Sequence, residues 1–163
     1  MRSDWAVRSF VGIAAVASAL AMIAPVMAAS SPVSKTLEQR FLAIDGSLSK
    51  SSATWTTAVA AVPASASQAQ ISTTLNKVSP PFAAALQTFD KQLAALALPG
   101  HAGADALAVI KDDKQLRTLL GSAGKMTKSQ FGKAFSGILT EELPLQKTFS
   151  KDLGLPATAS IVI

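Results

Sequence analysis

The feature that most constrains the fold is a row of eight large apolar residues between positions 67 and 98. Successive members lie three or four residues apart, so all eight fall on one face of an α-helix. The row consists of Ile71, Leu75, Val78, Phe82, Leu86, Phe89, Leu93 and Leu96. Burying it contributes roughly 12–24 kcal/mol, which is less than the backbone entropy lost when about thirty residues are ordered. The helix is therefore stable only if other helices cover this face.

Three further segments repeat the same spacing, and no stretch of comparable length alternates apolar and polar residues as a strand would. Capping-box sequences begin three of the four segments, at Thr36, Ser67 and Thr127. We expect helices over residues 36–62, 68–98, 105–120 and 128–153. Short turns join them, so neighbouring helices should be antiparallel. The sequence predicts an all-α fold, an antiparallel four-helix bundle over residues 36–154 with a tail over residues 155–163.

Prolines interrupt the helical pattern at residues 79–81 and at Pro144. An interior proline removes a backbone hydrogen bond and bends or breaks the helix. Because the apolar row continues in register past Pro80 and Pro81, we expect a kinked helix or two collinear ones there. Kinks in facing helices can leave a gap that binds an apolar ligand, or they can bend the helices around the core. Both interpretations stay open.

The first 28 residues have the layout of a cleavable signal peptide for the general secretory route. Basic residues precede an apolar run over residues 11–23, and Pro25 ends that run before a cleavage-type sequence. We expect cleavage after Ala28, with Ala29 as the second choice, and a short lead-in over residues 29–35. The mature protein should then be secreted or extracytoplasmic, and should meet the membrane only during export. An uncleaved membrane anchor is the alternative, on the length of the apolar stretch.

Residues that active sites need are scarce. The chain has no cysteine and a single histidine, His101, so thiol chemistry is excluded and a metal site lacks its usual ligands. His101 and Met126 are the candidate cofactor ligands, for haem, although no haem attachment motif is present. We expect no catalytic residue, no bound metal and no resident cofactor.

Two pairs of adjacent acidic residues, Asp112-Asp113 and Glu141-Glu142, could suggest a carboxylate dyad. Neighbouring residues on a helix point about 100° apart, so the members of a pair cannot converge on one substrate. We expect both pairs to lie on solvated helix faces.

The formal charge of +5 is unevenly placed. Six cations against two acidic residues lie between positions 111 and 133, a local excess of +4. The cations are Lys111, Lys114, Arg117, Lys125, Lys128 and Lys133. They could contact an anionic lipid or wall polymer, or they could form an ordinary solubilising face. Aromatic residues are not interleaved among them, which argues against nucleic-acid binding.

The phrase over residues 89–96, Phe-Asp-Lys-Gln-Leu-Ala-Ala-Leu, and the Ala/Ser/Thr-rich body resemble the uncharacterised exported helical proteins of actinobacteria. This resemblance implies export and transfers no activity and no site residue. The sequence therefore favours a non-catalytic binding or interaction module at the cell envelope, whose partner is an envelope protein, an anionic surface or a small apolar ligand. The alternative is an extracytoplasmic carrier of a small apolar ligand, haem being a minor case, in a cavity near the proline kinks.

Overall fold

The computed structural model describes residues 35–155, and this part of the chain is built from helices alone. They are α2 (Lys35–Ala60), α3 (Gln68–Ala95), α4 (Gly100–Ser122), the short 3-10 helix η1 (Ala123–Lys125) and α5 (Lys128–Asp152). The all-α prediction is confirmed. The expected signal peptide and nearly all of the expected tail lie outside the described residues.

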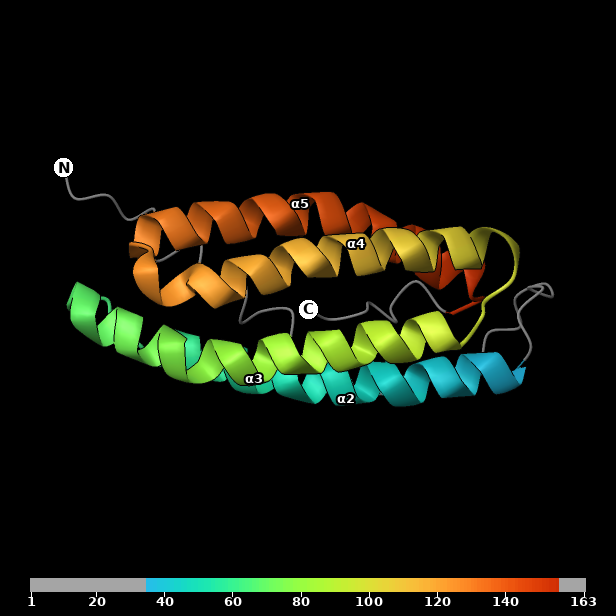
Figure 1. Cartoon of the computed structure of the whole chain (residues 1–163), viewed down its shortest axis with the longest axis horizontal. Coiled ribbons are helices and arrows are strands. Elements are labelled where there is room, and N and C mark those ends of the chain that lie inside the picture. Colours follow the sequence, from blue (N-terminus) through green and yellow to red (C-terminus); the bar gives the residue numbers. More distant parts are fainter. Residues whose placement is uncertain (1–34, 156–163) are drawn as a thin grey trace.

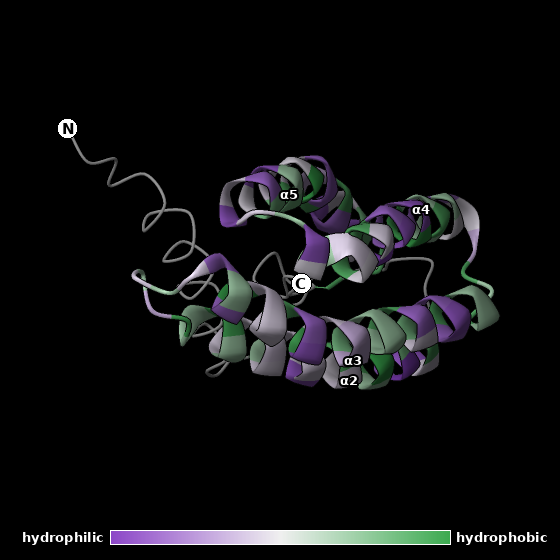
Figure 2. Cartoon of the chain, turned by 60° about the vertical axis from the view of Figure 1, so that its left-hand side comes forward, coloured by the Kyte–Doolittle hydropathy of each residue, from purple (hydrophilic) through white to green (hydrophobic). Residues whose placement is uncertain are grey.

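Consecutive helices pack side by side and reverse direction at each connection (Figure 1). α2 packs on α3, α3 on α4, and α4 on α5. Figure 2 shows the resulting two layers, with α2 and α3 in one and α4 and α5 in the other. Hydrophobic and hydrophilic residues alternate along every helix in that view, as expected for helices with one buried face.

Aromatic rings connect the two layers on the side where α2 faces α5. The ring centroid of Trp55 on α2 lies 5.2 Å from that of Phe135 on α5 and 5.5 Å from that of Phe82 on α3. Nearer the other end, Phe41 on α2 meets Phe149 on α5 edge to face at 5.3 Å. Such pairs stabilise a core beyond the area that they bury.

The helix starts follow the local sequence at two of the three expected places. Ser67 and Thr127 are N-caps with complete capping boxes, in which Gln70 and Gln130 accept hydrogen bonds from the cap residues' own amides. Thr36 instead lies inside the first turn of α2.

The helix expected to begin at residue 105 begins earlier, and the prediction of a loop over residues 101–103 is wrong. α4 begins at Gly100, whose φ of +56° lies in the left-handed region that glycine adopts without strain. The helix forms this early because Ala102 and Ala106, one turn apart, are both buried in the core.

Neither proline site breaks its helix. α3 runs without interruption through Pro80 and Pro81, and α5 runs through Pro144, so the interpretation as two collinear helices is wrong. Figure 1 shows α3 bowing gently along its length. Ser79, which could have capped a restarted helix, is buried instead, and its hydroxyl accepts a hydrogen bond from Trp55 Nε1 at 3.4 Å. This contact fastens α2 to α3 at the proline site.

Candidate functional site: a buried carboxyl cluster and a cationic exterior

Three acidic side chains from three different helices are buried in the interior of the fold. Asp90 lies on α3, Asp113 on α4 and Glu142 on α5, and the last two have no exposed surface at all. We define these residues as the carboxyl cluster. Each occupies a place in its helix that an apolar residue would normally fill, because each follows and precedes core residues by three, four or seven positions.

The expectation that both acidic pairs lie on solvated faces is therefore wrong for three of the four residues. Asp112, Asp113 and Glu142 are buried, and only Glu141 is exposed. The 100° rule between neighbours correctly excludes a dyad within a pair. It does not exclude contact between one member of each pair and an acid from another helix. The structure shows this second arrangement.

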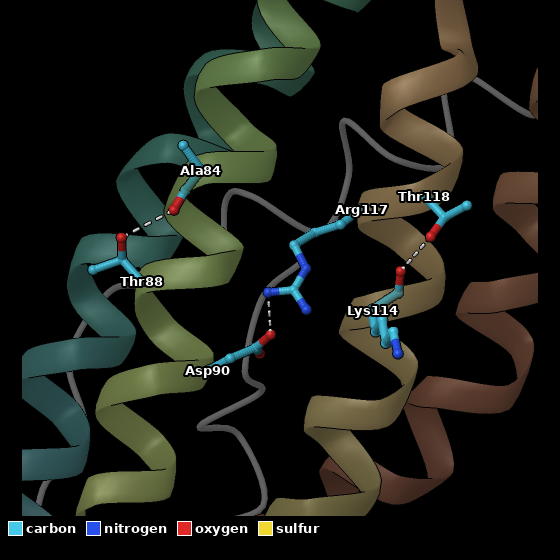
Figure 3. A network of polar contacts seen from close by, with 6 residues as sticks. All are labelled: Ala84, Thr88, Asp90, Lys114, Arg117 and Thr118. Atoms are coloured by element: carbon cyan, nitrogen blue, oxygen red, sulfur yellow. Dashed lines mark hydrogen bonds and ion pairs between the residues drawn. The ribbon is translucent and has the colours of Figure 1, made fainter.

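Arg117 is the cation that faces the cluster. It reaches from α4 toward α3, where its Nη1 lies 2.5 Å from Oδ2 of Asp90 (Figure 3). Burial raises the pKa of Asp90, while a hydrogen bond from Asp113 and the positive charge of Arg117 oppose that rise. Asp90 is thus the member of the cluster whose ionised form is best stabilised by its neighbours.

Asp113 is the member that carries a proton at neutral pH. Among the described residues, neither of its carboxyl oxygens receives a hydrogen bond from a donor group. Burial raises its pKa to about 10, and the hydrogen bond to Asp90 and the negative charges of Glu142 and Asp90 add to this rise. The protonated Asp113 donates to the Asp90 carboxylate, and Arg117 balances the single charge that the pair retains.

Glu142 titrates close to neutrality. Its Oε1 accepts a hydrogen bond from Gln146 Nε2 at 2.9 Å, whereas its Oε2 has no partner among the described residues. Burial raises its pKa to about 7; the Gln146 hydrogen bond lowers it, and the charges of Asp112 and Asp90 raise it. Asp112 stands at the edge of the cluster, where its Oδ1 accepts a hydrogen bond from Gln115 at 3.2 Å.

The carboxyl groups of the cluster can bind and release protons. A general acid or base must reach its substrate, and the three carboxyl groups are shielded from solvent. Within residues 35–155, no group of three or more His, Asp or Glu side chains is arranged to hold a metal ion.

The two candidate cofactor ligands are not brought together. His101 is exposed in the first turn of α4, whereas Met126 follows the far end of that helix, beyond η1. A helix of this length rises roughly 33 Å at 1.5 Å per residue, so the two side chains cannot bind one haem.

Each of these two residues has a local role. Burial, and then the charge and a hydrogen bond of Asp152, raise the pKa of Asp105, and the positive charge of His101 opposes this. The carbonyl oxygen of Met126 accepts a hydrogen bond from Gln68 at the start of α3.

The six cations of the predicted basic segment divide into two kinds. Lys111, Lys114, Lys125 and Lys133 are exposed, Lys128 is half-buried, and Arg117 turns inward to Asp90. Arg117 is therefore a structural partner of the cluster and not a surface contact. The sequence could not distinguish it from the lysines beside it, because its partner lies on another helix.

Charge of opposite sign is segregated between the surface and the interior. In residues 35–155, eleven of the thirteen lysines and arginines are exposed, against one of the nine acidic residues, Glu141. The exposed cations are Lys35, Arg40, Lys50, Lys77, Lys91, Lys111, Lys114, Lys125, Lys133, Lys147 and Lys151. The fully exposed charged side chains are thus almost all cationic, because most of the compensating carboxyl groups are buried or half-buried.

No helix among the described residues combines the length and the apolar character needed to cross a bilayer. The chain matches no protein-family model, no curated protein and no solved structure at a significant level.

Proposed function

We propose that the protein is an extracytoplasmic, non-catalytic helical module that binds an anionic surface of the cell envelope through its cationic exterior. The segregation of charge between surface and core is the observation that carries this proposal. A surface with eleven exposed cations and one exposed carboxylate attracts phosphate- and carboxylate-bearing polymers and lipids over distances of about a Debye length.

The buried acids strengthen this attraction in two ways. Asp113 holds its proton at neutral pH, so it does not cancel a surface cation. The negative charge of Asp90 is neutralised by its ion pair with Arg117 inside the fold. Long-range attraction depends on charge near the surface, and there Glu141 is the one exposed acid among the described residues.

Two further features belong to the proposal. The export signal of the first 28 residues would deliver the protein to the side of the membrane where wall polymers and outer-leaflet lipids lie. The four helices would form a closed antiparallel bundle, which the contacts of Trp55 and Phe41 on α2 with Phe135 and Phe149 on α5 support. A rigid bundle of this kind presents its lysines in fixed positions.

The test is co-sedimentation of the mature protein with vesicles that contain either an anionic phospholipid or a zwitterionic one alone. We expect binding to the anionic vesicles that weakens steeply between 50 and 300 mM salt, concentrations chosen to shorten the Debye length about 2.5-fold. Equal binding to both vesicle types, or binding that salt does not change, would overturn the proposal.

A pair of variants with the same charge locates the contact. One replaces Lys111, Lys114, Lys125 and Lys133 with Gln, and its matched control replaces Lys35, Lys50, Lys77 and Lys91. All eight side chains are exposed, so both variants should fold. A larger loss of affinity in the first variant would assign binding to the segment that the sequence singles out, and an equal loss would assign it to the whole exterior.

A further inference from the structure

The carboxyl cluster has fewer hydrogen-bond donors than its oxygens need. Arg117 pairs with Asp90, and Gln146 donates to one oxygen of Glu142. Both oxygens of Asp113 and the second oxygen of Glu142 receive no donor from the described residues. A buried carboxylate without donors is costly, whereas a protonated carboxyl group supplies its own donor and carries no charge. The buried carboxyl oxygens therefore have enough hydrogen-bond donors only when the cluster holds protons.

The charged groups of the cluster come from three helices. α3 contributes Asp90, and α4 contributes Asp112, Asp113 and Arg117. α5 contributes Glu142 with its partner Gln146.

α2 faces this region with the ring of Phe41, which contacts Phe89, the neighbour of Asp90, and Phe149. One turn along α2, half-buried Asp45 has its own pKa raised to about 6 by burial alone. This region of the fold thus contains four buried acids and one half-buried acid but a single arginine.

α5 lacks one backbone hydrogen bond in the segment that carries its member of the cluster. Pro144 lies between Glu142 and Gln146 and has no amide hydrogen, so the carbonyl oxygen of Thr140 lacks its normal partner in the helix. On the opposite side of this segment, Glu141, Leu143, Pro144 and Lys147 are all exposed. The cluster and the rings around it therefore carry much of the attachment of this segment to the other helices.

We propose that the Asp90–Asp113–Glu142 cluster is a proton-operated latch, which holds the second half of α5 against α3 and α4 in acid and loosens it as the pH rises from acid through neutrality. The proposal does not depend on the binding of anionic surfaces. When the segment opens, Asp113 and Glu142 reach water and their pKa values return to the ordinary range. Opening therefore releases protons, and higher pH favours it.

The size of the effect follows from this release. Each proton that the closed form keeps and the open form loses makes opening up to tenfold easier per pH unit. Glu142 contributes between about pH 4.5 and pH 7, and Asp113 contributes beyond pH 7 as well. Between pH 5 and pH 7 the two residues together favour opening by up to about 10⁴-fold.

Hydrogen exchange of the mature protein, followed by mass spectrometry and corrected for the intrinsic pH dependence of exchange, tests the latch. We expect protection of residues 140–152 to fall between pH 5 and pH 7, and protection of residues 71–79 at the other end of the fold to change less. Glu142→Gln should reduce the pH-dependent fall in α5 by up to about 100-fold, its share over two pH units. The matched control Glu141→Gln, one residue away and exposed, should leave the fall unchanged. Protection of α5 that is independent of pH, or an identical fall in Glu142→Gln, would overturn the proposal.

A second measurement on the unmodified sequence guards against a variant that does not fold. Carbon-13 NMR of the carboxyl groups should find one aspartate still protonated at pH 7 and one glutamate that titrates near pH 7. If every carboxyl group titrates below pH 5, the cluster holds no proton at neutrality and the latch is refuted.

Discussion

Replacing Glu142 with Gln should stabilise the whole fold at pH 8 and leave its stability almost unchanged at pH 4. Glu142 has no exposed surface, and burial is the main cause that raises its pKa from 4.5 to about 7. A carboxyl group with a raised pKa in the folded state binds its proton more tightly there than in the unfolded chain. The free energy of unfolding therefore falls as the pH rises from about 4.5 to 7, and stays low above that pH.

The magnitude follows from the difference between the two pKa values. At about 1.4 kcal/mol per unit, a rise of two to three units corresponds to about 3 kcal/mol of stability lost between pH 4 and pH 8. Gln cannot ionise, and its side-chain oxygen can still accept the hydrogen bond that Gln146 donates to Glu142. The variant should recover most of the 3 kcal/mol at pH 8, a large share of the 5–15 kcal/mol that stabilises a typical domain.

The assay is urea unfolding followed by far-ultraviolet circular dichroism at pH 4, 6 and 8, at constant ionic strength. Glu141→Gln is the matched control, because it removes the same charge from an exposed neighbour. If the wild-type protein is as stable at pH 8 as at pH 4, or if the two variants show the same pH profile, the burial argument for Glu142 is wrong.

Four further substitutions test separate parts of the structure by thermal or urea unfolding at pH 7. Arg117→Met removes the cation beside buried Asp90 and should cost about 3–5 kcal/mol, a loss that shrinks at pH 4 as Asp90 gains a proton; an equal loss at both pH values would contradict this. Gly103→Ala should destabilise the fold by about 1–3 kcal/mol, because the new Cβ would collide with the carbonyl oxygen of Leu98. Gly137→Ala, whose new Cβ would have no close neighbour, should instead stabilise the fold by about 0.5–1 kcal/mol. Thr127→Ala should cost about 1 kcal/mol through loss of the N-cap of α5, and an effect below 0.3 kcal/mol would show that the cap is dispensable.

We expect a core that contains acids and a surface that carries cations to reverse the usual pH response of a protein. Acid commonly unfolds proteins because paired native carboxylates must accept protons. Here Asp113, Glu142 and Asp45 hold protons more tightly in the fold than in the unfolded chain. The direction of all three shifts favours the folded state in acid, where the exterior is also most cationic.

The sequence by itself determined the helices. The spacing of the row from Ile71 to Leu96 fixes which face of α3 is buried, because a helix places residues three and four apart on one side. The capping boxes at Ser67 and Thr127 set two helix starts through contacts within four residues. Local signals were misleading at Gly100, where burial of Ala102 extends α4 backward, and at Pro80, where packing keeps α3 continuous.

Only the tertiary structure decided what the polar residues do. Asp90, Asp113 and Glu142 stand at core positions in their own helices, and that spacing was a readable signal of their burial. Their meeting, and the inward turn of Arg117, depend on contacts between residues 23 to 52 positions apart in the chain. The pKa of a carboxyl group is set by the charges, donors and solvent around it in space. Helix periodicity carries no information on these surroundings, so the carboxyl cluster emerged only when three helices were placed against one another.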